Sequence, residues 1–206
     1  MLTAEEIETN FAKFREHCTN TGNRSKNVLE LVDFLGTQLA LCPASTRYHM
    51  CEPGGLVKHS LNVLENAVRL RRAFKWQIND SSLILSALFH DIGKIGLVSE
   101  ENGEKKLVDF YVDAEKWKQE RYGTRYEVNQ DINSSRLYME TPQRSVYIMQ
   151  QFGITLSREE YLAILLNDGW VVDANREYCL KVPPLVTVIQ TADYVSTCQE
   201  NNVDGF

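Results

Sequence analysis

The segment ALFHDIGKIG, residues 87–96, places a histidine directly before an aspartate at the end of an apolar run. These residues are His90 and Asp91, and Gly93 and Lys94 follow them. Soluble helices usually keep ionisable side chains away from the buried face, because a buried charge without a partner is costly. An imidazole and a carboxylate at this position therefore either pair with other side chains or bind a cation.

Two further ionisable residues interrupt apolar segments elsewhere in the chain. His59 lies near the start of a segment with helical spacing of apolar residues, and Asp193 interrupts the run LVTVIQTADYV. A single buried histidine is usually just hydrogen-bonded, and a single aspartate on a helix usually faces water, so neither residue is informative alone. The helices predicted to carry His59, the His90–Asp91 pair and Asp193 would, if they converge, bring together two imidazoles and two carboxylates. A divalent cation would relieve the cost of burying these groups.

Mixed nitrogen and oxygen ligands suit one divalent ion of Mn, Fe, Co, Ni or Zn, and Mg is not excluded. Four protein ligands in an octahedral site leave two positions, for a water and a substrate oxygen. The ion would lower the pKa of that water and offset charge on a phosphoryl group. Because adjacent residues on a helix point about 100° apart, His90 and Asp91 can reach one ion only near a helix end. We expect Gly93 to provide that end.

Apolar spacing predicts an all-α domain of six or seven helices. The expected helices cover residues 4–18, 25–42, 56–74, 81–93, 145–153, 157–169 and 182–197. Thr3 and Glu6 form a capping-box pattern at the first of them. Residues 43–55 are expected to form a structured loop, because they are rich in proline and glycine. The polar segment 97–132 is expected to be an excursion from the bundle that contains a short hairpin.

Length and charge restrict the classes of partner. A chain of 206 residues suits one domain with a substantial core. The formal net charge of -6 argues against binding to long nucleic acids, which depends on many basic contacts. A small phosphorylated substrate remains open, because a metal ion can supply positive charge locally.

Cysteine usage and the N-terminus favour a cytoplasmic protein. The five cysteines are scattered, and no CxxC pair occurs among them. Reduced and mostly buried thiols are therefore expected, without a zinc knuckle or a redox motif. The segment MLTAEEIETN lacks a signal-peptide core, and no apolar stretch approaches the roughly 20 residues needed to span a bilayer. No membrane partner is expected.

Three segments carry the four candidate ligands in a fixed order: GGLVKHSLNV, LFHDIGKIG and IQTADYVST. Together they resemble the motifs of the HD superfamily of metal-dependent phosphohydrolases, although an isolated His-Asp pair would carry no such signal. The resemblance implies that His59, His90, Asp91 and Asp193 bind one metal ion. It also implies a single HD-type domain over residues 1–206. In that domain, N-terminal helices in residues 1–42 pack on a metal-site core of about 43–197.

The resemblance also suggests substrate-binding residues. The segment PASTRYHMCEPGGLVKHSL is similar to that of bacterial and phage members with a loop histidine before Gly-Gly. His49 matches that loop position, which implies contact with substrate, and a histidine that only packs the loop is an equal alternative. Lys94 matches a lysine often found after the His-Asp motif, where an ammonium group would bind a phosphate, and a solvated surface lysine is the alternative. Arg144 would suit a phosphate through its planar guanidinium, and a helix-surface arginine is the alternative.

The sequence departs from the pattern of dinuclear members, which have further histidines on the two helices before the last aspartate. The corresponding segments, METPQRSVYIM and LAILLNDGWVV, contain no histidine. A single metal ion is therefore expected. Arg144 and Asp168 in these segments would either bind substrate or pair with each other.

The resemblance implies a metal-dependent phosphohydrolase that acts on a nucleotide, either a phosphomonoester or a triphosphate, through a metal-activated water. Asp91, or a carboxylate near it, would orient or deprotonate that water, and Lys94 would hold a phosphate. One alternative is a phosphodiesterase or 3′–5′ nuclease that acts on short oligonucleotides or cyclic nucleotides. Another is a nucleotide-binding regulatory module with a degenerate site. The oligomeric state is left open, a homo-oligomer included.

Overall fold

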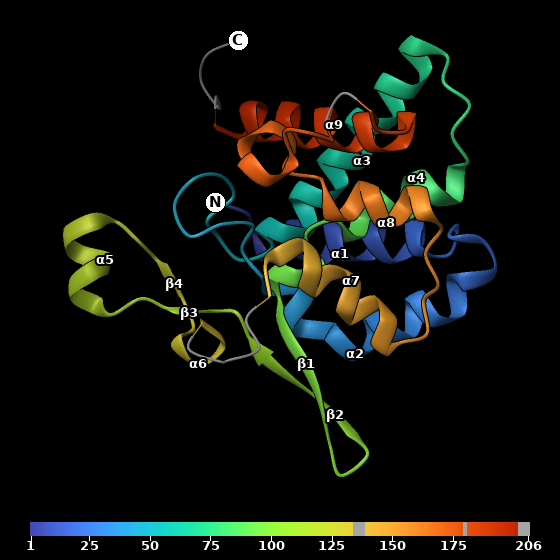
Figure 1. Ribbon diagram of the computed structural model, residues 1–206. Coiled ribbons are helices and arrows are strands. Elements are labelled where there is room, and N and C mark those ends of the chain that lie inside the picture. Colours follow the sequence, from blue (N-terminus) through green and yellow to red (C-terminus); the bar gives the residue numbers. More distant parts are fainter. Residues whose placement is uncertain (134–138, 179–180, 202–206) are drawn as a thin grey trace.

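The computed structural model describes residues 1–133, 139–178 and 181–201, apart from the side chains of residues 131, 133 and 170. Within these ranges the helices form a bundle from which two strand-containing segments project (Figure 1). The bundle consists of α1 (Ala4–Cys18), α2 (Ser25–Leu41), α3 (Gly55–Phe74), α4 (Asp80–Phe89), α7 (Thr141–Gln151), α8 (Arg158–Leu165) and α9 (Pro184–Asn201). The all-α class predicted from the sequence is confirmed, and the strands are confined to the projecting segments.

Helix α1 begins at the capping box that the sequence predicts. The Thr3 hydroxyl accepts a hydrogen bond from the Glu6 amide at 3.2 Å, and the Glu6 carboxylate accepts one from the Thr3 amide at 2.7 Å. Two of the first unpaired amides of the helix are satisfied in this way. Helices α1 and α2 then pack against α3, and the ring of Phe14 lies 5.6 Å from that of Phe89 in α4.

Helix α3 is the centre of the bundle. It packs against α9 on one side and α4 on another, and α8 contacts both α4 and α9. Apolar side chains such as Val63, Leu85 and Val188 are fully buried between these helices. Burial of these apolar faces is the main force that holds α3, α4 and α9 together. The candidate ligands lie on these three helices or directly after them.

The excursion around residues 97–132 contains the predicted hairpin and more regular structure than expected. Strands β1 (Gly96–Glu101) and β2 (Glu104–Asp109) pair antiparallel. A second antiparallel pair, β3 (Tyr111–Asp113) with β4 (Tyr126–Val128), flanks the short helix α5 (Lys116–Tyr122). Helix α6 (Gln130–Asn133) follows. In Figure 1 the β1–β2 hairpin points downward and the β3–α5–β4 arm points to the left.

Helix α4 ends earlier than the sequence predicts. It finishes at Phe89, and a turn of 3-10 helix, Ile92–Lys94, follows. Gly93 therefore does not terminate the helix. A Cβ atom at this position would lie 2.2 Å from the carbonyl oxygen of Thr141 and 2.7 Å from the amide nitrogen of Ser145. Gly93 instead allows the first turn of α7 to approach the backbone that carries the candidate ligands.

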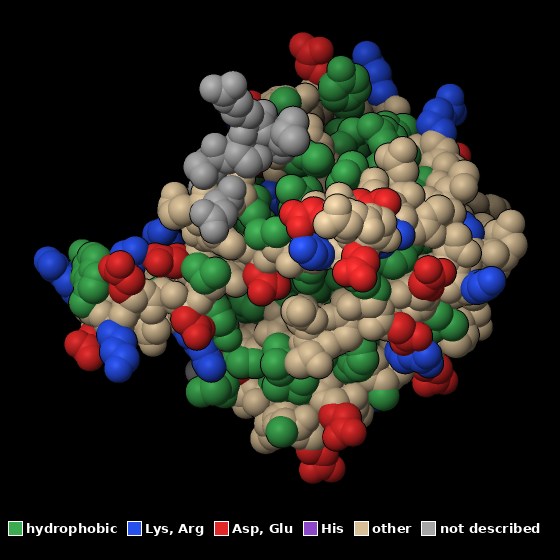
Figure 2. Space-filling model, turned by 90° about the horizontal axis from the view of Figure 1, so that it is seen from below, with side chains coloured by type: hydrophobic (Ala, Val, Ile, Leu, Met, Phe, Trp, Pro, Cys, Tyr) green, Lys and Arg blue, Asp and Glu red, His purple; other side chains and the backbone are tan. Residues whose placement is uncertain are grey.

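Three further expectations from the sequence concern membrane spans, cysteines and surface charge. In the part of the chain that the structure describes, no helix combines the length and the apolar character required to cross a membrane. Cys18 and Cys42 are buried, Cys51 and Cys198 are half-buried, and Cys179 lies outside the described residues. On the face shown in Figure 2, Lys and Arg side chains are mixed with Asp and Glu and do not gather into a continuous basic track.

Candidate metal centre

The structure brings together the four residues that the sequence selects as metal ligands. His59 lies in the second turn of α3, His90 caps the end of α4, Asp91 follows it, and Asp193 lies on α9. His59 Nε2 is 3.0 Å from Asp193 Oδ1 and 3.9 Å from Asp91 Oδ2. His90 Nε2 is 3.8 Å from Asp193 Oδ1 and 3.5 Å from Asp91 Oδ2. Two imidazole nitrogens thus face two carboxylates.

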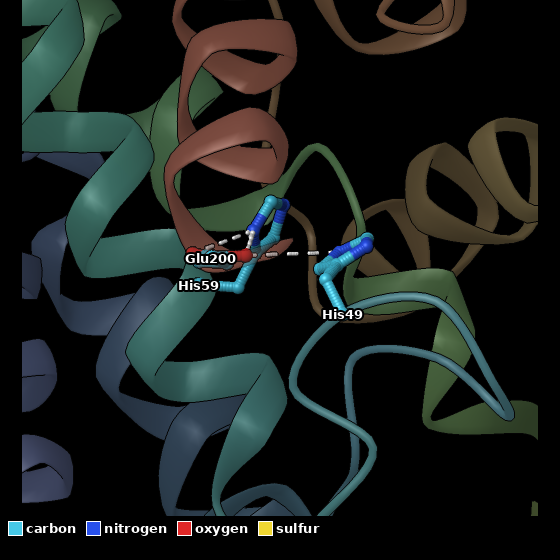
Figure 3. Close-up of side chains that lie close together, drawn as sticks. All are labelled: His49, His59 and Glu200. Atoms are coloured by element: carbon cyan, nitrogen blue, oxygen red, sulfur yellow. Dashed lines mark hydrogen bonds and ion pairs between the residues drawn. The ribbon is translucent and has the colours of Figure 1, made fainter. Parts of the chain in front are cut away.

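The hydrogen bonds around the two histidines leave the nitrogens that face the carboxylates unpartnered. The Nδ1 atom of His90 donates to the carbonyl oxygen of Ala87 at 2.9 Å, and that of His59 donates to Glu200 Oε2 at 2.9 Å (Figure 3). Because both acceptors are oxygens without protons, the Nδ1 atom of each ring carries a proton. Both Nε2 atoms are buried, and neither has a hydrogen-bond partner among the described residues. Buried nitrogens without a partner, opposite carboxylates, fit a divalent cation.

Charge in this cluster is balanced by close pairing. Burial would lower the pKa of His59, but contacts with Asp193 and Glu200 outweigh it and raise the pKa to about 9. Burial would raise the pKa of the Asp91 carboxyl, yet Lys94, His90 and His59 hold it well below its usual value. The cluster therefore keeps its carboxylates ionised and favours a positive charge between them.

Lys94 contacts the metal-site carboxylate directly. Its Nζ atom lies 2.5 Å from Asp91 Oδ2, and its side chain is 17 % exposed. Although burial disfavours the ammonium form, the Asp91 carboxylate raises the pKa of Lys94 above its usual value. Lys94 is thus a fixed cation at the site, and its predicted role on a phosphate stays a prediction.

Ser145 and Arg144 of α7 hold the turn that carries His90 and Asp91. The Ser145 hydroxyl accepts a hydrogen bond from the Gly93 amide at 2.8 Å and donates one to the His90 carbonyl oxygen at 2.8 Å. Arg144 Nε donates to the Gly93 carbonyl oxygen at 2.8 Å. Both polar groups of the Gly93 backbone are therefore bound by α7.

The environment of Arg144 does not fit the substrate-binding role expected from the sequence. The residue is 1 % exposed, and its guanidinium lies 4.0 Å from the centre of the Phe110 ring. Its Nη1 and Nη2 atoms donate to the carbonyl oxygen of Met139 and the hydroxyl of Thr141. A guanidinium enclosed by these partners supports the fold of the turn and has little surface left for a phosphate.

His49 reaches the site from the loop before α3. Its ring centre is 4.7 Å from that of His59, and its side chain is 10 % exposed. Burial and the nearby charges of His59 and Lys94 lower the pKa of His49 to about 4, so the ring is neutral at neutral pH. Both ring nitrogens are buried, and neither has a hydrogen-bond partner among the described residues. The predicted contact of His49 with substrate stays a prediction. The amides of Tyr48 and His49 donate to the hydroxyl of Ser45, which fixes the loop.

Asp168 lies after α8, within electrostatic reach of the cluster. Loss of hydration and the negative charges of Asp91 and Asp193 raise the pKa of Asp168 to about 6. Its neighbour Asn167 is 3 % exposed, and the Oδ1 atom has no hydrogen-bond partner among the described residues. Asp168 was expected from the sequence either to bind substrate or to pair with Arg144, and both roles stay predictions.

Sequence reasoning missed Glu200 and Ser145. Glu200 lies seven residues after Asp193 on α9, and a helix places residues at this spacing on the same face. That spacing could have identified Glu200 once Asp193 was taken as a ligand. Nothing in the sequence distinguishes Ser145 from an ordinary serine in the first turns of a helix.

The fold and the site together define a helical metal-binding domain. Residues 56–198, more than half of the chain, match the family model described as HD domain, and the chain belongs to the HD superfamily of metal-dependent phosphohydrolases. Members of this family bind divalent metals and are generally hydrolases. Comparison with curated proteins and with solved structures found no match.

Proposed function

We propose that this protein is a phosphohydrolase that uses one divalent metal ion and acts on a nucleotide. The observation that carries the proposal is the pair of buried, unpartnered Nε2 atoms of His59 and His90 opposite Asp91 and Asp193. When bound there, a divalent ion supplies an acidified water and positive charge for a phosphoryl group.

The residues around the ligands have complementary roles in the proposal. Asp91 remains a carboxylate and accepts a hydrogen bond from Lys94, so its oxygens are fixed in orientation. Asp168, which lies within electrostatic reach of Asp91 and Asp193, is a second carboxylate that would accept a proton released from water. Lys94 places an ammonium group beside the ligands, where it would offset the charge of a phosphate.

The choice of a small substrate rests on charge and on His49. With a net charge of -6, the protein needs the positive charge of the site itself to attract an anion. The neutral ring of His49 offers one hydrogen-bond donor and one acceptor at the edge of the site. These groups would suit a phosphate oxygen or a sugar hydroxyl. A nucleotide combines both, which is why we place it before other phosphate esters.

The proposal is tested by measuring hydrolysis of a panel of phosphorylated substrates. The panel contains nucleoside mono- and triphosphates, cyclic dinucleotides and short oligonucleotides, each with Mn²⁺, Co²⁺ or Mg²⁺. We expect turnover of nucleoside phosphates to fall by about 100-fold or more in Asp91→Ala, because the variant loses a ligand and the group that orients water. Asp33→Asn removes an exposed carboxylate of α2 and should retain full activity.

The outcomes separate the proposed function from its alternatives. Cleavage of oligonucleotides or cyclic dinucleotides, with nucleoside phosphates left intact, would replace the nucleotidase by a phosphodiesterase. Tight nucleotide binding without turnover under any metal would favour a regulatory module. Equal turnover by Asp91→Ala and the wild type would contradict the metal-site mechanism.

A further inference from the structure

We infer that Glu200 positions His59 for metal binding by accepting the proton of its Nδ1 atom, and that Asn62 holds Glu200 in place. The inference rests on the metal site of the proposed function and adds residues to it. The match to the HD family ends at residue 198, so Glu200 lies outside the part of the chain that the family describes.

The His59 ring lies between two carboxylates of one helix. Asp193 Oδ1 is 3.0 Å from the Nε2 atom, and Glu200 Oε2 is 2.9 Å from the Nδ1 atom. The two acidic residues are seven positions apart on α9, which is about two turns of helix, so they project from the same face. Helix α9 therefore supplies a ligand beside one nitrogen of His59 and a hydrogen-bond acceptor for the other.

Glu200 is fixed by a second contact from α3. Its side chain is 3 % exposed, and Asn62 Nδ2 donates to its Oε1 atom at 2.7 Å. Both carboxylate oxygens are thus engaged by α3, one with Asn62 and one with His59. A carboxylate that accepts the Nδ1 proton fixes the orientation of the ring, leaves the Nε2 lone pair available and makes that nitrogen a better ligand.

The same region offers a second interpretation, in which it binds another cation. One donor atom from each of His49, His59 and Glu200 lies within 4.8 Å of the others (Figure 3). His49 Nε2 is 3.9 Å from Glu200 Oε2, beyond hydrogen-bond distance. An ion on His59 Nδ1 would displace the proton that this nitrogen donates to Glu200, and one imidazolate would then join two ions. The hydrogen-bonded arrangement needs no such change, and we therefore assign Glu200 to positioning.

The test compares Glu200→Ala and Glu200→Gln with a control variant in the same helix interface. Asn66 lies one turn after Asn62 on α3, and its Nδ2 atom donates to Ser196 Oγ at 2.8 Å and to Gln199 Oε1 at 2.9 Å. Asn66→Ala therefore weakens the packing of α3 on α9 without touching His59. Co²⁺ affinity and stoichiometry are measured on the full chain. The His59 Nδ1 proton is followed by NMR of metal-free protein with ¹⁵N-labelled histidine.

We expect Glu200→Ala to weaken Co²⁺ binding by about 10- to 100-fold, the usual effect of losing a group that orients a ligand. Glu200→Gln should lose less, because its amide oxygen still accepts the Nδ1 proton. The signal of that proton should be protected from exchange in the wild type and in Asn66→Ala, and lost in Glu200→Ala. Asn66→Ala should bind Co²⁺ like the wild type even where its melting temperature falls.

Three results would overturn the assignment. Equal Co²⁺ affinity in Glu200→Ala and Asn66→Ala would reduce Glu200 to a packing residue. Two Co²⁺ ions per wild-type chain, falling to one in His49→Ala, would assign the cluster to a second ion. A wild-type chain that binds no divalent ion would remove the metal site and the role of Glu200 with it. By contrast, Co²⁺ binding that depends on Glu200, without turnover of any nucleotide, would support the assignment and overturn only the proposed substrate.

Discussion

The hydroxyl of Ser145 accepts a hydrogen bond from the amide of Gly93 at 2.8 Å. It also donates to the carbonyl oxygen of His90 at 2.8 Å, so one side chain spans the turn that contains Asp91. Ser145 and Gly93 are 52 residues apart in sequence. The position of the His-Asp pair therefore depends on α7 as well as on α4, and two ligands of the proposed site are set by a contact between distant segments.

Ser145→Ala should weaken both stability and metal binding. The change leaves the buried amide of Gly93 without an acceptor, which costs about 1–3 kcal/mol of unfolding free energy. It also releases the turn, so Co²⁺ affinity should fall. Ser86→Ala is a matched control, because it removes a buried hydroxyl that has no hydrogen-bond partner among the described residues. Urea unfolding and Co²⁺ titration of both variants test this, and a destabilised Ser145→Ala with wild-type affinity would show that α7 does not set the ligands.

Gly55→Ala should displace the loop that carries His49. A Cβ atom at Gly55 would lie 2.1 Å from the carbonyl oxygen of Met50 and 3.0 Å from the amide nitrogen of Ala44, so the loop backbone has to move. If His49 binds substrate, KM should rise by about 10-fold, the value of roughly one hydrogen bond. Steady-state kinetics should give His49→Ala a rise of the same size, and Co²⁺ affinity should change little in either variant. A normal KM in both would restrict His49 to packing the loop.

Much of the helical architecture and the candidate ligand set could be predicted from local sequence signals. Thr3 and Glu6 predict the start of α1, because a capping box is formed by residues that are close in sequence. His59 and Asp193 were recognisable because each interrupts an apolar pattern, a conflict that usually marks a site. In the structure, His59 Nε2 and Asp193 Oδ1 are 3.0 Å apart.

The features that the sequence did not indicate concern residues whose surroundings come from distant parts of the chain. Gly93 resembles a helix terminator in the sequence. In the structure its lack of a side chain allows the backbone of α7 to pack closely against it, and no local sequence pattern indicates this contact. From the sequence alone, Arg144 resembles a surface or substrate-binding arginine. Its acceptors include the backbone carbonyls of Gly93 and Met139, and no sequence pattern identifies those contacts. Glu200 resembles a solvated acid near a helix end until α3 is packed against it.

Substitution of Arg144 should distinguish support of the fold from substrate binding. Arg144→Met keeps most of the side-chain volume but loses the hydrogen bonds to Gly93 and Met139 and the contact with Phe110. We expect the unfolding free energy to fall by about 2–4 kcal/mol and KM to stay within a factor of about two at a temperature where the variant is folded. Arg144→Lys should recover little, because an ammonium group cannot reproduce the planar set of donors. A large rise in KM at wild-type stability would restore the substrate role.

Glu160 should make stability depend on pH in the acid range. Its carboxylate accepts hydrogen bonds from Arg24 Nη1 at 2.6 Å and from the Ser157 amide at 2.7 Å. Burial would raise the pKa of Glu160, but these two partners outweigh it and lower the pKa below the usual 4.5. The folded protein therefore binds this proton more weakly than the unfolded chain. The stabilisation is complete above about pH 4.5 and is lost as the pH falls through the lower pKa of the folded state.

Glu160→Gln should accordingly reduce the unfolding free energy by about 1.5–3 kcal/mol at pH 7, and the difference from the wild type should narrow below pH 4.5. Glu6→Gln provides the control, because Glu6 occupies the same capping-box position in α1 but is exposed, and solvent screening should make its effect much smaller. Urea unfolding of the three proteins between pH 3 and pH 7 measures the difference. A gap between Glu160→Gln and the wild type that stays constant over this range would mean that the ionised carboxylate does not hold α8 to Arg24. The loss at pH 7 would then come from packing of the side chain alone.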